Sequence, residues 1–462
     1  MNETVKKNDI YEIEITDIGT NGEGIGKLNE LVIFVPDAVT GDKLKVKILK
    51  VKKNLAYGKV EEVIEPSPLR REPYCAVSKK CGGCQLQHLS YKAQLEWKQN
   101  KVYNALTRIG GLKDIEVLPT LGMENQAHYR NKAQYPIRKE DGKVQIGFYA
   151  SRSHRVVDWE SCGIQDARCE QVIKIVRNFL ETHNISIYDE EKHTGLVRHL
   201  MVRTGFFTGE MMVCLVINGD SLPHKEAFLK ALEAVEGITS VVLSINKAKT
   251  NVILGYEIKV LQGRDYIIDT IGDLKFKISA LSFFQVNPVQ TKVLYDKALE
   301  YAELTGNETV WDAYCGTGSI SLFLAQKAKK VYGVEIVAPA IENANANAEL
   351  NGITNAEFFV GKAEEVIPAK YEEGLVADTI VVDPPRKGCD EALLETLIKM
   401  APEKIVYVSC DPATLARDLG YLAGNGYKVE KVQPVDMFPE TTHVETCVLL
   451  SHKNPQTSPP SL

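Results

Sequence analysis

The sequence lacks any long hydrophobic run. Among its 462 residues no stretch approaches the roughly 18 apolar residues that a membrane span requires. Residues 1–10 carry charges and contain no apolar segment of the kind found in signal peptides. These absences argue against a membrane-spanning or exported chain, and we expect a cytoplasmic monomer that does not bind membranes.

Cysteine is scarce as well. Ten cysteines in a chain of this length, mostly scattered, argue against a disulfide framework. Internal repeats are absent, and the only low-complexity segment is the tail at 455–462, which we expect to be disordered. The composition, 44% hydrophobic and 25% charged, is that of a globular protein, and the length predicts about three domains. The net charge of -6 argues against wholesale nucleic-acid coating but does not exclude local basic faces.

Residues 8–62 alternate apolar and polar side chains in short runs separated by turn residues. This alternation predicts a small antiparallel β-barrel over residues 1–62. The barrel contains a run of lysines with no acidic residue between them: Lys43, Lys45, Lys47, Lys50, Lys52, Lys53 and Lys59. The first three share one strand face by the two-residue period. The run is either a solvated strand face or a face that contacts RNA phosphates.

The range 63–280 predicts a central α+β domain, with helices over 91–110 and 170–183 and strands over 145–149, 200–204 and 211–217. Residues 129–138 and 151–155 place aromatic and basic side chains side by side. That mixture suits stacking and phosphate contacts to single-stranded RNA. A solvated strand face is the alternative explanation.

Four cysteines of this central range form a candidate metal site. They are Cys75, Cys81, Cys84 and, farther along the chain, Cys162. Four thiolates suit either a tetrahedral zinc ion or an iron–sulfur cluster, and the spacing does not choose between them. Gly82 and Gly83 let the backbone wrap closely around either one. Cys169 is better explained as a core residue.

From residue 281 onward strands alternate with helices, which predicts a Rossmann-like domain over 281–454. Residues 310–322 form a strand, a glycine turn and a helix start, and Glu335 ends the next apolar run, where an acid can bind ribose hydroxyls. The third glycine of a dinucleotide fingerprint is absent, which favours S-adenosylmethionine over NAD. Asp383 ends another strand at the same crevice.

Cys410 stands where an apolar, β-branched run meets a helix start. Asp411 and Pro412 are suited to the cap and the first helical position. The positive end of the helix dipole favours thiolate over thiol, so the position suits a nucleophile. A buried cysteine that fills space at a sheet edge is the alternative.

Taken together, these motifs resemble the bacterial RNA (uracil-5-)-methyltransferases of the RumA type. The resemblance rests on residues 283–287 (FFQVN), 312–318 (DAYCGTG), 383–388 (DPPRKG), 409–418 (SCDPATLARD) and 443–445 (HVE), in that order. In addition, residues 21–26 (NGEGIG) are similar to the pattern of a TRAM domain, a small barrel that implies RNA binding. The implied fold is α/β: a Rossmann-like S-adenosylmethionine-dependent methyltransferase domain, an N-terminal β-barrel and a central α+β domain.

The resemblance also implies roles for individual residues. Cys410 would be the nucleophile and Glu445 the base. The residues implied to contact S-adenosylmethionine are Gln285, Tyr314, Glu335 and Asp383. A 4Fe-4S cluster would be held by Cys75, Cys81, Cys84 and Cys162. One departure is Gly361, which stands where relatives often carry Asp or Asn near the adenine, so the adenine-edge contact is not assigned.

The implied reaction transfers a methyl group to C5 of a uridine through a covalent adduct between Cys410 and C6, which the base Glu445 resolves. The expected substrate is 23S rRNA, and a tRNA T-loop uridine is the alternative. Two other classes compete. An amino-methyltransferase would carry an aromatic residue where Arg386 stands, and a non-catalytic RNA-binding protein with a structural cluster would have no use for Cys410 and Glu445.

Overall fold

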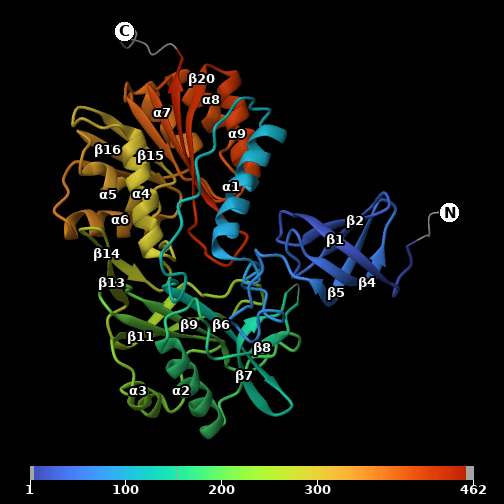
Figure 1. Ribbon diagram of the computed structural model, residues 1–462. Coiled ribbons are helices and arrows are strands. Elements are labelled where there is room, and N and C mark those ends of the chain that lie inside the picture. Colours follow the sequence, from blue (N-terminus) through green and yellow to red (C-terminus); the bar gives the residue numbers. More distant parts are fainter. Residues whose placement is uncertain (1–4, 152, 454–462) are drawn as a thin grey trace.

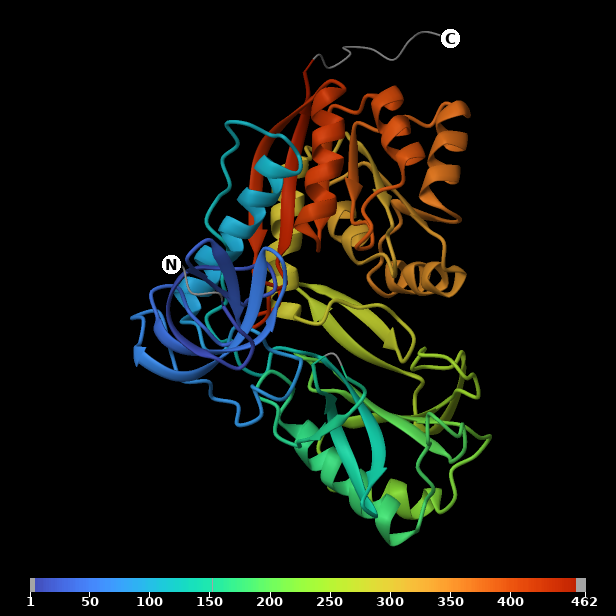
Figure 2. The ribbon, with the colours of Figure 1, turned by 90° about the vertical axis from the view of Figure 1, so that its right-hand side faces the viewer.

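The computed structural model describes residues 5–151 and 153–453 and arranges them in three regions (Figures 1 and 2). A small barrel (blue) stands beside the junction of a central region (green) and a C-terminal α/β region (yellow to red). The tail expected at 455–462 lies outside the described residues. No helix within the described ranges is both long enough and apolar enough to span a lipid bilayer.

The N-terminal region is a closed barrel of five strands in the order β1-β2-β3-β5-β4. The strands are β1 (Ile10–Ile18), β2 (Gly24–Leu28), β3 (Leu31–Val35), β4 (Lys43–Val51) and β5 (Leu55–Glu65). Neighbours pair antiparallel, as predicted, except β3 and β5, which are parallel. A Cβ atom at Gly26 would lie 2.3 Å from a methyl carbon of Ile13, so the barrel interior requires glycine there.

Strand pairing changes the interpretation of the lysine run. Lys43 forms an ion pair with Glu65 at 2.8 Å, and Lys45 forms one with Glu62 at 2.7 Å. Lys59 pairs with its neighbour Glu61 at 3.0 Å. The run contains no acid, but β5 places acids beside β4. Charge is therefore neutralised over part of the lysine face, for which the sequence leaves open solvent exposure or RNA contact.

The central region is built on a seven-stranded sheet with the order β12-β11-β10-β9-β6-β7-β8. Its strands are β6 (Lys132–Glu140), β7 (Lys143–Tyr149), β8 (Val156–Asp158), β9 (Val197–Thr204), β10 (Met211–Ile217), β11 (Ile238–Ile245) and β12 (Glu257–Gly263). Helices α2 (Arg168–Thr182) and α3 (Lys225–Leu232) pack on it through an apolar core that includes Val176 and Phe228.

Two segments of the range 63–280 pack against the C-terminal region instead. Helix α1 (Tyr91–Arg108) lies along helix α9 (Pro412–Gly424) (Figure 1). The approach is close, because a Cβ atom at Gly420 would lie 2.7 Å from the Gly110 carbonyl oxygen. The hairpin β13 (Tyr266–Ile271) and β14 (Leu274–Ser279) packs on α4 (Pro288–Ala302) and α6 (Ala338–Leu350).

The C-terminal region is a doubly wound seven-stranded sheet with the order β17-β16-β15-β18-β19-β21-β20. Its strands are β15 (Thr309–Ala313), β16 (Lys330–Glu335), β17 (Ala356–Val360), β18 (Thr379–Val382), β19 (Lys404–Ser409), β20 (Tyr427–Val435) and β21 (Glu445–His452). The remaining helices are α5 (Ser319–Ala325), α7 (Ala363–Glu372) and α8 (Glu391–Met400). Apolar cores cover both faces. Strand β21 lies between β19 and β20 and runs antiparallel to both.

Candidate active site

The predicted site residues of the C-terminal region lie together where the parallel strands of its sheet end. We call this side of the sheet the strand-end edge. Parallel strands open their carboxyl ends toward a common crevice. Glu335 ends β16, Asp383 follows β18 and Cys410 follows β19. Glu445 joins them from the opposite chain direction, because the reversed strand β21 begins at this edge with Glu445 beside Val435 and Thr446 beside Ser409.

Cys410 occupies the strand-to-helix junction that the sequence predicts. The Asp411 side chain caps α9 by accepting hydrogen bonds from the backbone N–H of Ala413 at 2.9 Å and of Thr414 at 3.2 Å. Pro412 is the first residue of the helix. The thiol is half-buried, so the position combines a fixed backbone with partial access.

The expected preference for thiolate is not found. Burial, together with the nearby carboxyl groups of Glu445 and Asp383, raises the pKa of Cys410 to about 12, although Arg386 opposes the rise. The helix N-terminus was the only local feature available to the sequence interpretation. Burial and two acids from distant segments outweigh it, so the free protein holds Cys410 as a thiol at neutral pH.

The two carboxyl groups beside Cys410 are perturbed in the same direction. Burial, with a smaller contribution from Asp383, raises the pKa of Glu445 to about 8 against the opposing effect of Arg386. Burial also raises the pKa of Asp383 to about 7. Glu445 is only 4% exposed. The site therefore contains two carboxyl groups that gain or lose a proton near neutral pH, and Arg386 is a nearby cation.

The glycine turn after β15 has an unusual backbone. Tyr314, Gly316 and Gly318 all have positive φ, at 69°, 55° and 79°. Glu335 braces this turn by accepting hydrogen bonds from the N–H of Gly316 at 3.3 Å and of Val337 at 3.0 Å. A tight, left-handed turn at a helix start lets a ligand approach the backbone, as the sequence predicts.

Gln285 lies in the segment that precedes α4. Its backbone carbonyl accepts a hydrogen bond from the Asn131 side chain at 3.0 Å, and Asn287 caps α4 by accepting from the N–H of Gln290. The Thr317 hydroxyl donates to the Phe283 carbonyl at 3.5 Å, which joins this segment to the glycine turn. The structure thus brings Gln285 to the crevice from another part of the chain.

Asp312 on β15 links this strand to helix α5, and the sequence interpretation gave it no role. It is completely buried and accepts a hydrogen bond from the Ser321 hydroxyl. Burial raises the pKa of Asp312 to about 7 even with this hydrogen bond. Its place in the strand-end motif is the sequence signal that could have identified it.

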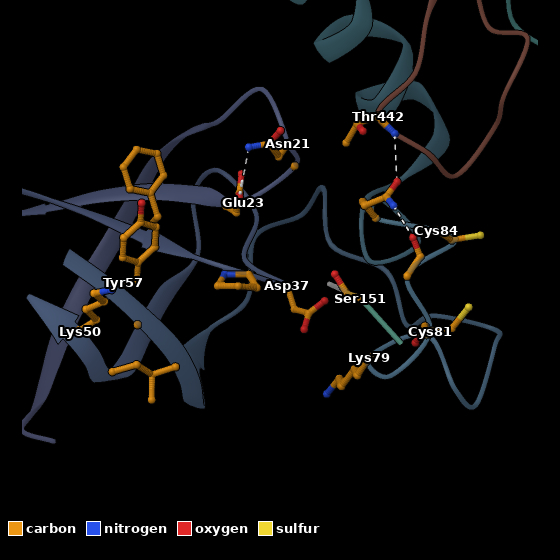
Figure 3. Close-up of a pocket in the computed structure, with 18 of the residues that line it drawn as sticks. Asn21, Glu23, Asp37, Lys50, Tyr57, Lys79, Cys81, Cys84, Ser151 and Thr442 are labelled. Carbon is orange, nitrogen blue, oxygen red and sulfur yellow. Dashed lines mark hydrogen bonds between the residues drawn. The ribbon is translucent and has the colours of Figure 1, made fainter. Parts of the chain in front are cut away.

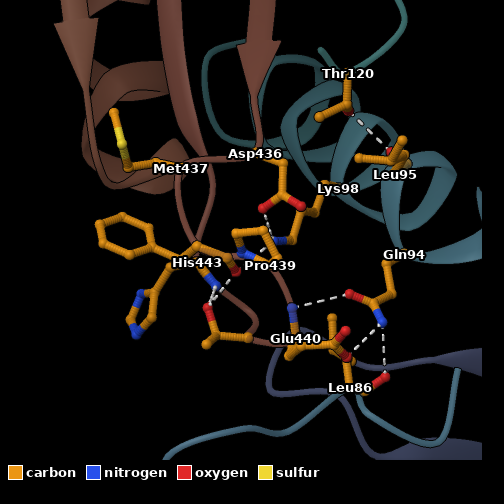
Figure 4. A network of polar contacts seen from close by, with 12 residues as sticks. Leu86, Gln94, Leu95, Lys98, Thr120, Asp436, Met437, Pro439, Glu440 and His443 are labelled. Carbon is orange, nitrogen blue, oxygen red and sulfur yellow. Dashed lines mark hydrogen bonds and ion pairs between the residues drawn. The ribbon is translucent and has the colours of Figure 1, made fainter. Parts of the chain in front are cut away.

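The loop of residues 436–444 carries the chain from β20 into Glu445, and it is held by a polar network with α1 (Figure 4). Asp436 forms an ion pair with Lys98 and accepts a hydrogen bond from the Tyr91 hydroxyl at 2.9 Å. Gln94 donates to the Glu440 carboxylate at 3.0 Å and accepts from the Glu440 N–H at 3.1 Å. These partners are far apart in sequence, so no local pattern reveals them.

The four predicted cysteine ligands line one cavity of about 470 Å³. All four are free thiols, and the Cys81 sulfur accepts a hydrogen bond from the Gly83 N–H at 3.4 Å. Within the described ranges no three cysteine, histidine or acidic residues are close enough to hold a single metal ion. Arg386 and His443 line the same cavity, so the cysteines adjoin the strand-end crevice.

The doubly wound sheet, its strand-end crevice and the braced glycine turn define a methyltransferase of the S-adenosylmethionine-dependent class. Residues 90–453 match the family model described as tRNA (Uracil-5-)-methyltransferase, and residues 5–60 match the TRAM domain. The chain therefore belongs to the tRNA (uracil-5-)-methyltransferase family. It is an S-adenosylmethionine-dependent RNA methyltransferase with an N-terminal TRAM barrel, and the alternative of a non-catalytic RNA-binding protein is set aside.

Similar proteins agree with this assignment. A Clostridium tetani protein named as an uncharacterized RNA methyltransferase is 59% identical over 97% of each chain. A relative of the same description from Halalkalibacterium halodurans is 53% identical over 97% of this chain and 98% of its own. The solved structure of Pyrococcus abyssi tRNA (uracil-54, C5)-methyltransferase in complex with S-adenosyl-L-homocysteine is 30% identical, with a TM-score of 0.76 over 95% of this chain and 99% of its own. The predicted fold and enzyme class are confirmed.

Proposed function

We propose that the protein methylates C5 of a uridine in 23S rRNA, with Cys410 as the nucleophile and Glu445 as the base. One observation carries the proposal: Cys410 and Glu445, 35 positions apart in the sequence numbering, meet at the same sheet edge, where Glu445 contributes to the raised pKa of Cys410. A thiol and a carboxyl group placed together beside a methyl-donor crevice are what methylation of uracil C5 requires.

The reaction follows from the weak nucleophilicity of uracil C5. The half-buried Cys410 thiol releases its proton to solvent and the sulfur adds to C6, which breaks the C5–C6 π bond and moves its electron pair toward C5 and the O4 enolate. S-adenosylmethionine would supply the methyl group that C5 takes up, and S-adenosylhomocysteine would be the leaving group. Glu445 removes the C5 proton, the C5–C6 double bond forms again and the C6–sulfur bond breaks. Cys410 leaves as a thiolate, and the product is 5-methyluridine.

The depth of the site limits the form in which RNA can react. Glu445 has 4% of its surface exposed, so a base stacked within a helix cannot reach it. The target uridine must be turned out of its stack into the crevice. Arg386, which lowers the pKa of both Cys410 and Glu445, favours their charged forms during the reaction.

Four residues are proposed to hold S-adenosylmethionine. Glu335, already oriented by two backbone N–H groups, would accept hydrogen bonds from the ribose hydroxyls. Gln285, Tyr314 and Asp383 would complete the binding site. The left-handed turn at Gly316 fits this role, because no protein atom lies within 4 Å of the position that a Cβ atom would take there.

A 4Fe-4S cluster is proposed for the cavity lined by Cys75, Cys81, Cys84 and Cys162. A cluster of four irons holds its thiolates farther apart than a single ion does, which fits four sulfurs spread around one cavity. Hydrogen bonds from backbone N–H groups to sulfur, as at Cys81, are common around such clusters. The cluster would order the surrounding loop, and no step of the methyl transfer passes through it.

Metal analysis tests the cluster directly. Protein purified without oxygen should be brown and contain about four irons and four sulfides per chain. Cys84→Ala should lose both, whereas Cys169→Ala, which alters a buried core cysteine outside the cavity, should keep them. One zinc per chain without sulfide would contradict the proposal.

Trapping of the covalent adduct tests the catalytic roles. Cys410→Ala should form no RNA adduct and no product, and Cys169→Ala is the matched control. Glu445→Gln should add and methylate but stall, so that an adduct containing the transferred methyl group survives denaturing electrophoresis. The wild-type protein should stall in the same way on RNA that contains 5-fluorouridine. Product formation by Cys410→Ala, or turnover of Glu445→Gln at the wild-type rate, would refute the assignment.

The target RNA needs its own test. The combination of a TRAM barrel with a cysteine cluster supports 23S rRNA, whereas the similarity to the Pyrococcus abyssi tRNA (uracil-54, C5)-methyltransferase supports the tRNA alternative. Mapping of 5-methyluridine in rRNA and tRNA from a deletion strain separates the two. Loss from 23S rRNA alone supports the first target, and loss from tRNA alone supports the second.

A further inference from the structure

A cavity of about 790 Å³ lies between the TRAM barrel and the loop of residues 75–84, which we call the cysteine loop. The barrel contributes Lys50 and Tyr57 from one side (Figure 3). Lys79, Cys81 and Cys84 lie across from them on the cysteine loop. This volume is within the range of cavities that hold small ligands, so one or a few nucleotides can enter it.

The barrel wall of this cavity is aromatic. The rings of Phe34 and Tyr57 stack with their centroids 5.8 Å apart and their planes 28° from parallel. Both side chains are only half-buried, so ring surface remains open toward the cavity. Partly exposed aromatic rings are the feature on which unpaired bases stack in proteins that bind single-stranded nucleic acids.

The cations of the cavity differ from Lys43 and Lys45 in having no acidic partner in the part of the chain that the structure describes. Lys50, Lys52 and Lys79 are exposed, and none of them forms an ion pair with another described residue. Lys43 and Lys45, on the same strand as Lys50, are neutralised by β5. Lys50 and Lys52 therefore stand beside the aromatic wall without an acidic partner among the described residues.

Two carboxyl groups also line the cavity, Glu23 and Asp37. They do not form ion pairs with Lys50, Lys52 or Lys79 in the described residues, so three cations remain available against two acids. This balance, together with the rings, matches a nucleotide that offers both a base and a phosphate. It does not match a purely apolar ligand.

The cavity shares wall residues with the cysteine cavity, which adjoins the strand-end crevice. Cys81 and Cys84 line both this cavity and the cysteine cavity, which also contains Arg386. Thr442, from the loop that leads to Glu445, lines the cavity beside the barrel. An RNA strand that crosses the cysteine loop can therefore contact the barrel and the crevice at the same time.

We propose that this cavity binds an unpaired stretch of the substrate RNA next to the target uridine. A base stacks on Tyr57 and Phe34, and phosphates pair with Lys50, Lys52 and Lys79. The placement of this RNA stretch next to the target uridine rests on the proposed function, whereas binding of single-stranded RNA in the cavity does not. The two can therefore fail separately.

The test measures the binding of a fluorescein-labelled oligouridylate by anisotropy over a range of salt concentrations. Every protein carries Cys410→Ala, so that no covalent adduct forms. Lys50→Gln/Lys52→Gln should weaken binding roughly tenfold at low salt and reduce the salt slope by about 1.4, since each phosphate contact on a single strand contributes about 0.7. The matched control Lys43→Gln/Lys45→Gln removes two lysines of the same strand that are already paired and should leave the slope unchanged.

A second variant separates stacking from charge. Tyr57→Leu keeps an apolar side chain but removes the ring, and it should weaken binding about tenfold without a change of slope. Circular dichroism must show that each variant keeps its barrel. The proposal is overturned if the Lys50/Lys52 variant binds the oligouridylate like its control. It is also overturned if the variants lose as much affinity for a duplex RNA of equal length. Methylation assays of the corresponding proteins that retain Cys410 report independently on the proposed function.

Discussion

Lys98 on α1 and Asp436 after β20 form an ion pair in which neither side chain has any exposed surface. Burial lowers the pKa of Lys98, and the attraction of Asp436 opposes this effect. Lys98 also donates to the Phe438 carbonyl at 3.0 Å. Helix α1 thereby holds the start of the 436–444 loop, and this loop fixes where Glu445 enters the sheet.

Breaking this ion pair should destabilise the protein. Lys98→Met leaves the Asp436 carboxylate buried without its cation, which typically costs about 3–5 kcal/mol. We expect a lower midpoint in urea unfolding and a lower kcat, because the loop that leads to Glu445 loses its anchor. Lys92→Met removes an exposed lysine of the same helix and should change neither. Lys98→Met/Asp436→Leu should recover much of the stability, and a wild-type midpoint in the single variant would contradict this account.

The rate of adduct resolution should rise with pH. Burial raises the pKa of Glu445 to about 8, and only the carboxylate form can accept the C5 proton, so the active fraction grows as pH increases toward that value. Adduct should therefore accumulate at acid pH and disappear faster at alkaline pH. Quenched single-turnover assays on denaturing gels measure this step. Glu445→Gln should accumulate adduct at every pH, and a wild-type rate that falls as pH rises would exclude Glu445 as the base.

Stability should respond to pH in the opposite direction. The pKa of Glu445 is raised from 4.5 to about 8 by folding, so the folded protein binds more protons than the unfolded chain between these values. The share of stability linked to Glu445 is fully present below about pH 4.5 and is lost as pH rises through 8. Glu445→Gln should remove this share of the pH dependence in thermal unfolding. An unchanged pH profile would contradict the raised pKa.

Alanine at two glycines of the turn after β15 should separate folding from cofactor binding. At Gly318 a Cβ atom would lie 3.0 Å from the Ala344 Cβ, so Gly318→Ala should lower the melting temperature. At Gly316 the same atom meets no protein atom within 4 Å, so Gly316→Ala adds only backbone strain of about 1–2 kcal/mol. Calorimetric titration should show a larger loss of S-adenosylmethionine affinity than of stability for Gly316→Ala. Equal losses would mean that the space beside Gly316 is not used by the cofactor.

The features that the sequence predicts correctly are those encoded locally. The turn at Gly316 and Gly318 and the strand-to-helix junction at Cys410 depend on a few adjacent residues, and the structure contains both. The thiol pKa of Cys410 could not be predicted, because it depends on burial and on Asp383 and Glu445, which come from other strands. The neutralisation of Lys43 by Glu65 depends on strand pairing in the same way.

Helix α1 illustrates the same limit at a larger scale. Its helical span, predicted as 91–110, is found at Tyr91–Arg108, because periodicity is a local signal. Its packing on α9 is not local, since it depends on Gly110 and Gly420 meeting across more than half of the chain. The polar network that secures Glu440 follows from that packing and was equally inaccessible from the sequence.

The insertion of β21 between β19 and β20 has a consequence for how the enzyme is made. During translation β19 and β20 leave the ribosome first, and they cannot complete the sheet because their shared neighbour has not yet been synthesised. The strand that closes the sheet is also the strand that brings Glu445 to Cys410. A nascent chain that stops short of β21 therefore lacks both a finished domain and the proposed base. Such an incomplete chain cannot complete the methylation cycle.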